Sequence, residues 1–382
     1  KKHLYVLAQG IDIEDQRHRY WFFDKKEEKW AYGIIYPNQL TDLIIKHFKS
    51  NKTLEYLQFS NWFVNIEETV IQGMWKETIE TGLIQEIPIP KPFGIEKINL
   101  KSTAIIRLDT RIRDQLNSFL DNSGYLFKVF QRPLLSKFIQ QFHHRYDDRF
   151  VSLAKLIHEE DIFESTFRED KEDWEHVNQY PSKPFSSSIQ QINLKEPKGK
   201  KLPDEVRDIQ ILFHLSRNGE IIFDNVVCNR PFVYSGRFTD DPDIHEIASN
   251  SVPANNPDSP IFCDIEVFES ETIRFLTQHQ NVFTHVLSPI PNPSKKEIPL
   301  SELYLGIEGN NTIKLVWKAK NKEVIPVFQH PLNGSQITHP LFRLLWEISN
   351  QHPVKFLPYL QTSPGESCYF PQLNWDTLIL QP

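Results

Sequence analysis

The sequence predicts an α+β fold in which most of the strands are antiparallel. Three observations favour this class. Asn218-Gly219 lies between two apolar runs and is a strong signal for a β-hairpin. Short β-runs alternate with proline-containing turns over residues 262–316. Stretches with helical spacing, such as residues 341–348, stand apart from these strands and do not alternate with them.

The first 88 residues predict a small module of their own. Residues 1–18 read as the tail of a preceding element, and residues 19–88 as a winged-helix module. Its expected elements are a hairpin over 19–36, helices over 40–48, 53–57 and 67–81, and a strand at 83–84. The third helix ends before Gly82, which suits the C′ position of a helix.

A proline-rich segment over residues 87–93 marks a boundary. Beyond it, residues 89–382 form the mixed, mostly antiparallel α+β region. Its expected elements are a strand over 104–108 ending at Asp109, helices over 111–130, 135–146 and 341–348, a hairpin over 209–226, and a last strand over 377–380.

Composition excludes several classes of protein. No apolar run approaches the roughly 20 residues that span a bilayer, and the first ten residues lack the pattern of a signal peptide. The three cysteines are far apart, which argues against a structural zinc site or a disulfide framework and fits the cytoplasm. Because the net charge is −7, any contact with nucleic acid must come from a local basic patch.

The familiar catalytic signatures are missing: the sequence contains no G-x-S-x-G, H-E-x-x-H, G-x-G-x-x-G or Walker loop. No metal site is expected. His143 and His144 are adjacent on a helix, about 100° apart, and cannot easily share a metal ion. The charge run over residues 158–161 reads as a solvated face.

Arg237 is the most interesting single residue. It follows Ser235-Gly236, which lets the backbone turn tightly, and its planar guanidinium suits a carboxylate or a phosphate. The ordinary explanation is an ion pair with Asp240 or Asp241 across a turn. Lys198 and Lys200 lie in a polar loop that could touch a nucleic-acid backbone, although an ordinary solvated loop is the favoured explanation.

Several segments, in order, resemble the class I lanthipeptide (lantibiotic) dehydratases over roughly residues 100–382. They are the stretch over 134–156 with its Arg145-Tyr146, Gly236-Arg237-Phe238, IPLSELY at 298–304, VIPV at 324–327, PLFRLL at 340–345, and YFPQL with Asn374-Trp375 at 369–375. The family also carries a winged-helix module that binds the leader part of a precursor peptide, and residues 19–88 have that pattern.

The resemblance implies an enzyme that glutamylates Ser and Thr of a ribosomal precursor peptide and then eliminates glutamate to leave dehydroamino acids. Glutamyl-tRNA would be the co-substrate, and no other cofactor is expected. By motif, Arg237 corresponds to an Arg of the family's glutamylation site, and Asp109 to an Asp of the same site. Arg237, Lys198 and Lys200 are the residues expected to contact the tRNA.

The resemblance also implies where the leader peptide binds. An open hairpin edge accepts an extended segment as an added strand. Ile34, Ile35 and Tyr36 would pair with the leader, and its apolar side chains would lie beside Ile71 and Trp75 of the third helix.

Two parts of the family pattern are missing from this sequence: an Arg-rich Ser-Thr-Pro-Phe-Gly stretch and the elimination domain. We therefore expect this chain alone to be inactive, or to act with a separate elimination domain and a lanthionine cyclase. Two alternatives are a non-catalytic peptide-binding scaffold and a relative that uses aminoacyl-tRNA to extend a peptide.

Overall fold

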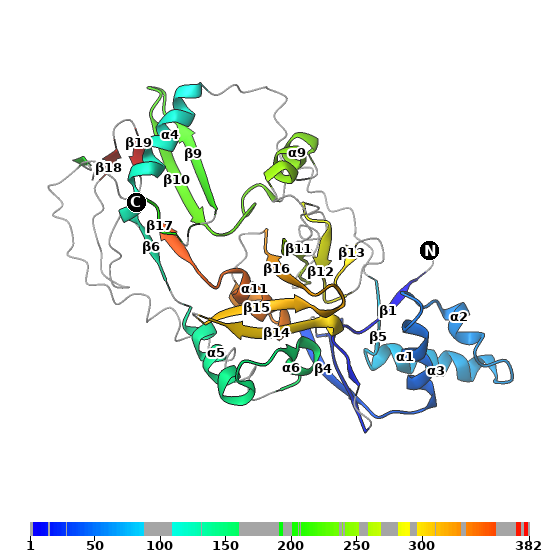
Figure 1. Cartoon of the computed structure of the whole chain (residues 1–382). Coiled ribbons are helices and arrows are strands. Elements are labelled where there is room, and N and C mark those ends of the chain that lie inside the picture. Colours follow the sequence, from blue (N-terminus) through cyan, green and yellow to red (C-terminus); the bar gives the residue numbers. More distant parts are fainter. Residues whose placement is uncertain are drawn as a thin grey trace.

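The structure is a computed structural model with an N-terminal module, a seven-stranded sheet in the centre and a five-stranded sheet beyond it (Figure 1). It describes residues 3–13, 16–27, 29–87, 109–130, 132–159, 191–193, 201–204, 206, 208–236, 239, 241–251, 259–268, 282–290, 296–309, 311–329, 334–356, 372–375 and 378–380. Most strand pairs are antiparallel, as the sequence predicted, although both large sheets also contain parallel pairs.

The N-terminal module contains the expected hairpin, three helices and final strand. Its elements are β1 (Tyr5–Leu7), β2 (Asp12–Ile13), β3 (His18–Asp24), β4 (Lys29–Ile35), α1 (Gln39–Phe48), α2 (Tyr56–Ser60), α3 (Glu68–Glu80) and β5 (Ile84–Glu86). Asn38 caps α1 by accepting a hydrogen bond from the Thr41 amide. Gly82 ends α3 with a left-handed φ of +75°, and a Cβ there would overlap Phe22. The description of this module as a winged helix stays a prediction.

The N-terminal module begins earlier than the sequence analysis placed it. β1 pairs antiparallel with β5, so that Tyr5 lies opposite Glu86. Val6, at the centre of β1, is fully buried, because its side chain packs with Trp30, Phe268 and Ile290. Residues 3–13 are therefore built into this module, whereas the sequence had assigned residues 1–18 to a preceding element.

The seven-stranded sheet has the order β13-β12-β11-β16-β15-β14-β7 and carries the largest hydrophobic core. Its strands are β7 (Val151–Ser152), β11 (Ile261–Ile265), β12 (His285–Leu287), β13 (Lys296–Glu297), β14 (Leu303–Glu308), β15 (Thr312–Trp317) and β16 (Lys322–Val327). The helices of this core are α5 (Pro133–Tyr146), α6 (Leu153–Leu156) and α11 (Pro340–Ser349). Short 3₁₀ turns are η4 (Leu300–Glu302), η5 (Lys318–Lys320) and η6 (Gly334–Gln336).

α11 is buried on every side from residue 341 to residue 348. This burial includes Glu347, whose carboxylate is fully inaccessible to solvent. Arg132, at the start of α5, donates two hydrogen bonds of 2.8 Å to Glu347, and Arg343 donates a third of 3.2 Å from one turn earlier. Both guanidinium groups also lie over the Trp346 ring. The buried carboxylate of Glu347 thus accepts three hydrogen bonds from two guanidinium groups, and these hydrogen bonds offset its removal from water.

The five-stranded sheet has the order β8-β18-β19-β10-β9. Its strands are β8 (Gln191–Asn193), β9 (Ile209–Leu215), β10 (Ile221–Cys228), β18 (Gln372–Trp375) and β19 (Leu378–Leu380). The helix α4 (Thr110–Asn122) shares a core with it, and the pair β6 (Phe127–Val129) and β17 (Val354–Phe356) joins this region to α11. Another helix, α9 (Pro242–Ser251), follows β10 in the chain.

One helix is shorter than the sequence predicted. A single helix was expected over residues 111–130, but α4 ends at Asn122 and a 3₁₀ turn, η2 (Gly124–Leu126), follows it. Phe127 then begins a strand, because its buried ring packs against Phe356 of the partner strand at a centroid distance of 5.2 Å. Tertiary pairing has overridden local helical spacing here.

The β3–β4 hairpin packs against both the helices of its own module and the seven-stranded region. On the module side, Tyr20 is buried and its hydroxyl donates to the Thr81 carbonyl. On the other side, the Trp30 ring meets His339, at the start of α11, with a centroid distance of 4.5 Å. Burial lowers the pKa of His339 to about 3, so the ring stays neutral at physiological pH and its Nδ1 accepts from the Leu341 amide.

His158 lies at the same junction, which corrects the interpretation of residues 158 and 159 as part of a solvated face, whereas residues 160 and 161 lie outside the described residues. His158 is buried, its Nε2 is 2.9 Å from the Gly10 carbonyl, and its ring meets Tyr32 of β4. The neighbouring Glu159 forms an ion pair with Arg145 of α5.

We predict that Glu347→Ala destabilises the protein by about 3–5 kcal/mol, because Arg132 and Arg343 then face each other without the carboxylate between them. Urea denaturation followed by Trp fluorescence measures the change. The matched control is Glu80→Ala, which removes the exposed pair with Lys76 and should leave the midpoint almost unchanged. Equal midpoints for the two variants would contradict the assigned role of Glu347.

Candidate functional site

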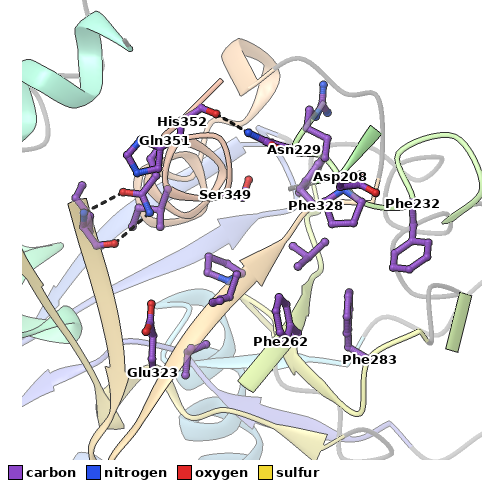
Figure 2. A pocket seen from close by; sticks show the side chains of 18 of the residues that line it. Asp208, Asn229, Phe232, Phe262, Phe283, Glu323, Phe328, Ser349, Gln351 and His352 are labelled. Atoms are coloured by element: carbon purple, nitrogen blue, oxygen red, sulfur yellow. Dashed lines mark hydrogen bonds between the residues drawn. The ribbon is translucent and has the colours of Figure 1, made fainter. Parts of the chain in front are cut away.

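A cavity of about 790 Å³ opens between the two large sheets (Figure 2). The loop over residues 229–236 after β10, the β15–β16 hairpin, and the end of α11 with the residues that follow it line the cavity, together with residues of β9 and β11 and with Phe283. The side chains that line it include Asp208, Gln210, Asn229, Arg230, Phe232, Phe262, Phe283, Lys314, Glu323 and Gln351.

Gln210 braces the loop over residues 229–236. Its Nε2 donates a hydrogen bond of 2.6 Å to the Arg230 carbonyl, and its Oε1 accepts from the Tyr234 amide at 3.2 Å. Asn229 adds a second tie, because its side-chain amide donates to the His352 carbonyl at 2.9 Å (Figure 2). Gln210 of β9 thereby holds the loop at Arg230 and Tyr234, and the segment after α11 holds its first residue, Asn229.

The loop holds a strained backbone. Phe232 has a left-handed φ of +60°, a conformation that costs a bulky residue roughly 1–2 kcal/mol. Hydrogen bonds from Gly236 to the Phe232 carbonyl, at 2.6 Å, and from Val233 to the Arg230 carbonyl hold this turn in place. Strain that is maintained by surrounding contacts often accompanies a ligand site.

Three phenylalanines form an aromatic wall on one side of the cavity (Figure 2). The rings of Phe262 and Phe283 are stacked, with a centroid distance of 5.9 Å and an interplanar angle of 18°. Phe232 meets Phe283 edge to face at 6.1 Å. Such a wall can receive the flat face of an aromatic group.

The charged groups of the cavity are affected by their partial removal from water. Burial lowers the pKa of Arg230, although a guanidinium keeps its proton at neutral pH, and burial raises the pKa of Asp208. Tyr234, close to Arg230, has its pKa raised by burial. Lys314 pairs with Glu308 at 2.5 Å, which raises the pKa of that lysine. The cavity thus places a permanent cation near an aromatic wall.

The structure places the predicted site residues in different regions. Arg237, Lys198 and Lys200 lie outside the described residues, although Arg237 directly follows the loop that lines the cavity. Asp109 is the N-cap of α4: it accepts from the Arg111 amide at 2.9 Å, and hydrogen bonds from Arg111 lower its pKa. Asp109 is not among the residues that line the cavity.

Gly236 does permit a close approach of the backbone, but to the protein itself. A Cβ on Gly236 would lie 2.8 Å from the backbone oxygen of Gln329, and Gln329 in turn donates to the buried Asp264. The small residue before Arg237 therefore lets this loop pack against the segment that follows β16.

The expected leader-binding residues divide into two groups. Ile34, 49% exposed, and Tyr36, 72% exposed, lie on or just after β4, which is an outer strand of its three-stranded sheet. Ile71 is buried, and Trp75 packs against Phe59 at a centroid distance of 4.9 Å. Ile35 also packs against the module's core. Ile34 and Tyr36 are therefore exposed beside the open edge of β4, whereas Ile35, Ile71 and Trp75 pack in the core of the module.

Sequence reasoning missed the cavity residues. Phe262 and Phe283 come from segments far from Phe232, and no spacing in the sequence brings them together. The nearness of Arg230 to the Ser-Gly-Arg motif was the one available signal. Within the described ranges, no three His, Cys, Asp or Glu side chains are grouped as a metal site would require, and no helix there has the length and apolarity to cross a membrane.

Comparison with known proteins supports the resemblance. Residues 222–382 match the family described as "Lantibiotic dehydratase, N terminus". A search of curated proteins finds no match. Among solved structures, the chain is similar to the tRNA dependent lantibiotic dehydratase MibB from Microbispora sp. 107891, with a TM-score of 0.70 and 12% identity over 99% of this chain and 47% of that chain.

A second similar structure is the glutamylation domain of TbtB from thiomuracin biosynthesis, with a TM-score of 0.60 and 13% identity over 100% of this chain and 58% of that chain. The same domain bound to 5'-phosphodesmethylglutamycin gives a TM-score of 0.57, 12% identity and the same coverage. The chain spans about half the length of these proteins. Residues 222–382 thus match the lantibiotic dehydratase family, and the whole chain has the fold of its glutamylation region.

Proposed function

We propose that this chain takes part in tRNA-dependent glutamylation, in which glutamate passes from glutamyl-tRNA to Ser or Thr hydroxyls of a precursor peptide. The hydroxyl oxygen attacks the ester carbonyl, a new ester forms, and the ribose oxygen of the tRNA leaves with a proton. The observation that carries the proposal is the cavity, where Arg230 stands near an aromatic wall on a loop that leads directly to Arg237.

Each chemical part of the cavity has a counterpart in that reaction. A guanidinium in a half-buried setting attracts a phosphate or the glutamyl carboxylate, and it also stabilises an oxyanion that develops at the ester carbon. The aromatic wall suits the terminal base of the tRNA. Gln210 acts as a positioning residue, because it fixes the loop that carries Arg230 and Phe232. Asp109, Lys198 and Lys200 remain proposed contributors to the reaction and to tRNA binding.

The N-terminal module is the proposed site of peptide recognition. β4 is an outer strand, and Ile34 and Tyr36 lie exposed beside its edge. A leader segment that adds to this edge would form main-chain hydrogen bonds there, while Ile35, Ile71 and Trp75 keep the strand packed. We propose that the reaction takes place in the cytoplasm and that an elimination domain and a lanthionine cyclase act after it.

We predict that Arg230→Gln lowers the yield of glutamyl adducts roughly 10-fold or more, because the cavity loses the guanidinium proposed to stabilise the developing charge. Arg237→Lys keeps the charge but loses the planar fork, and it should also lower the yield. The measurement is mass spectrometry of the precursor peptide, with the protein from the complete gene and an inactive elimination step. Arg217→Gln, in an exposed turn, is the matched control. Normal yields from both the Arg230 variant and the Arg237 variant would refute the proposed function.

For peptide recognition, we predict that Ile34→Pro weakens binding of a labelled leader peptide, because proline removes a strand donor and fixes φ. Ile34→Ala keeps the backbone donor and should bind nearly normally. Fluorescence anisotropy measures the affinity, and circular dichroism checks that both variants fold. If the folded proline variant binds as tightly as the alanine variant, strand addition at β4 is wrong.

A further inference from the structure

A buried carboxylate, that of Asp264, lies beside the aromatic wall of the cavity. Asp264 belongs to β11, where its side chain alternates with those of Cys263 and Ile265, which pack in the largest hydrophobic core. It therefore points to the same face of the sheet as Phe262, whose ring is part of the aromatic wall. Asp264 is only 2% exposed and is not among the residues that line the cavity. Its carboxylate can thus influence the cavity only through neighbouring residues.

One oxygen of this carboxylate holds the backbone of Phe283. The Phe283 amide donates a hydrogen bond to Asp264 Oδ2 at 3.4 Å. The Phe283 ring is central to the aromatic wall, because it stacks on Phe262 and also meets Phe232 edge to face (Figure 2). Asp264 therefore fixes the chain at the residue whose ring contacts both other members of the wall.

The other oxygen of the carboxylate acts on the opposite part of the wall, through Gln329. Gln329 is buried, and its Nε2 donates a hydrogen bond to Asp264 Oδ1. Gly236 packs so closely against Gln329 that a Cβ on this glycine would lie 2.7 Å from the Cβ of Gln329. The Gly236 amide donates to the Phe232 carbonyl at 2.6 Å, and the Thr239 hydroxyl donates to the Gly236 carbonyl at 2.9 Å. Gln329 thus supports the turn that carries Phe232.

These contacts form a closed circuit that includes the ring contact between Phe232 and Phe283. One path runs from Asp264 to the Phe283 amide and ring. The other runs from Asp264 through Gln329 and Gly236 to Phe232. Phe232 has a left-handed φ of +60°, and a strained residue of this kind keeps its conformation only when surrounding contacts hold it. The circuit supplies such contacts from both sides of the ring pair.

We propose that Asp264 is a positioning residue of the cavity, whose carboxylate fixes Phe283 and the turn at Phe232 together and so sets the geometry of the aromatic wall. Its effect on catalysis rests on the proposed function, in which the wall receives the terminal base of glutamyl-tRNA. A carboxylate suits this role because its two oxygens accept hydrogen bonds from two directions. Hydrogen bonds to an ionised acceptor are also stronger than those between neutral groups.

The structural test is amide hydrogen exchange, measured by mass spectrometry. Asp264→Asn nearly keeps the volume but loses the charge and one acceptor oxygen, so exchange over residues 229–236 and at Phe283 should rise about 10-fold or more. The double variant Asp264→Asn/Gln329→Glu exchanges the positions of the carboxylate and the amide. It restores one donor and one acceptor at the same place, so protection should return.

The matched control for exchange is Ser288→Ala. Ser288 is buried just after β12, and its hydroxyl donates to the Ile290 carbonyl at 2.8 Å. This variant also loses a buried hydrogen bond in the same sheet, but one that supports no residue of the aromatic wall. Exchange over residues 229–236 should therefore stay unchanged.

The functional test uses the protein from the complete gene and initial rates of glutamyl-adduct formation. Asp264→Asn should raise the KM for glutamyl-tRNA about 10-fold, because stacking of a base on the disturbed wall is weakened. The KM for the precursor peptide should stay unchanged, and the double variant should recover the lower KM for glutamyl-tRNA. A merely structural role would instead lower the melting temperature and the apparent kcat and leave both KM values as they were.

Unchanged exchange in Asp264→Asn, an equal rise in Ser288→Ala, or a folded double variant without recovered protection would overturn the positioning role. A normal KM for glutamyl-tRNA in Asp264→Asn would also overturn it and would leave the proposed function intact. Conversely, loss and recovery of protection in a protein that forms no glutamyl adducts would support the role of Asp264 in the cavity and refute only the glutamylation.

Discussion

The fold depends on keeping one carboxylate, that of Glu347, buried and neutralised. Arg132 reaches it from the start of α5, and Arg343 from the preceding turn of α11. Their geometry fixes α11 against α5, and α11 connects the other parts: its first turn contacts the β3–β4 hairpin through His339, and its last turn lines the cavity through Ser349. A buried ion pair specifies this arrangement more than it stabilises it, since an apolar pair could fill the same space.

The sequence predicted correctly those elements that are determined by residues close together in the chain. The hairpin around Gly219, the amphipathic helices α1, α3 and α5, and the stop at Gly82 follow from turn chemistry and apolar spacing. The errors arose where distant segments decide the structure. β1 is a strand because β5 lies beside it, and the chain after Asn122 leaves the helix because Phe127 pairs with a strand more than 200 residues later. A prediction from a short stretch of sequence cannot identify strand partners that lie this far away in the chain.

The candidate site was less predictable than the fold, for a related reason. The Ser-Gly-Arg motif begins in the loop that lines the cavity, but the other lining residues come from β9, β11, the β15–β16 hairpin and α11. Phe283 and Gln210 resemble ordinary strand or turn residues in the sequence, and only the tertiary structure gives them a common cavity.

The long sequence separation of the closing contacts has a consequence for how the chain folds during synthesis. The sheet formed by β1 and β5 cannot close until residue 86 has left the ribosome. The ion pair between Arg132 and Glu347 cannot form until the 215 residues that separate them in the sequence have been synthesised. At about 5–20 residues per second, that wait lasts roughly 10–40 s. Non-local closures of this kind also slow folding after release. The pairing of β1 with β5 is therefore possible well before the central core forms, and the five-stranded sheet closes only when β19 reaches β10, after every residue that lines the cavity has been synthesised.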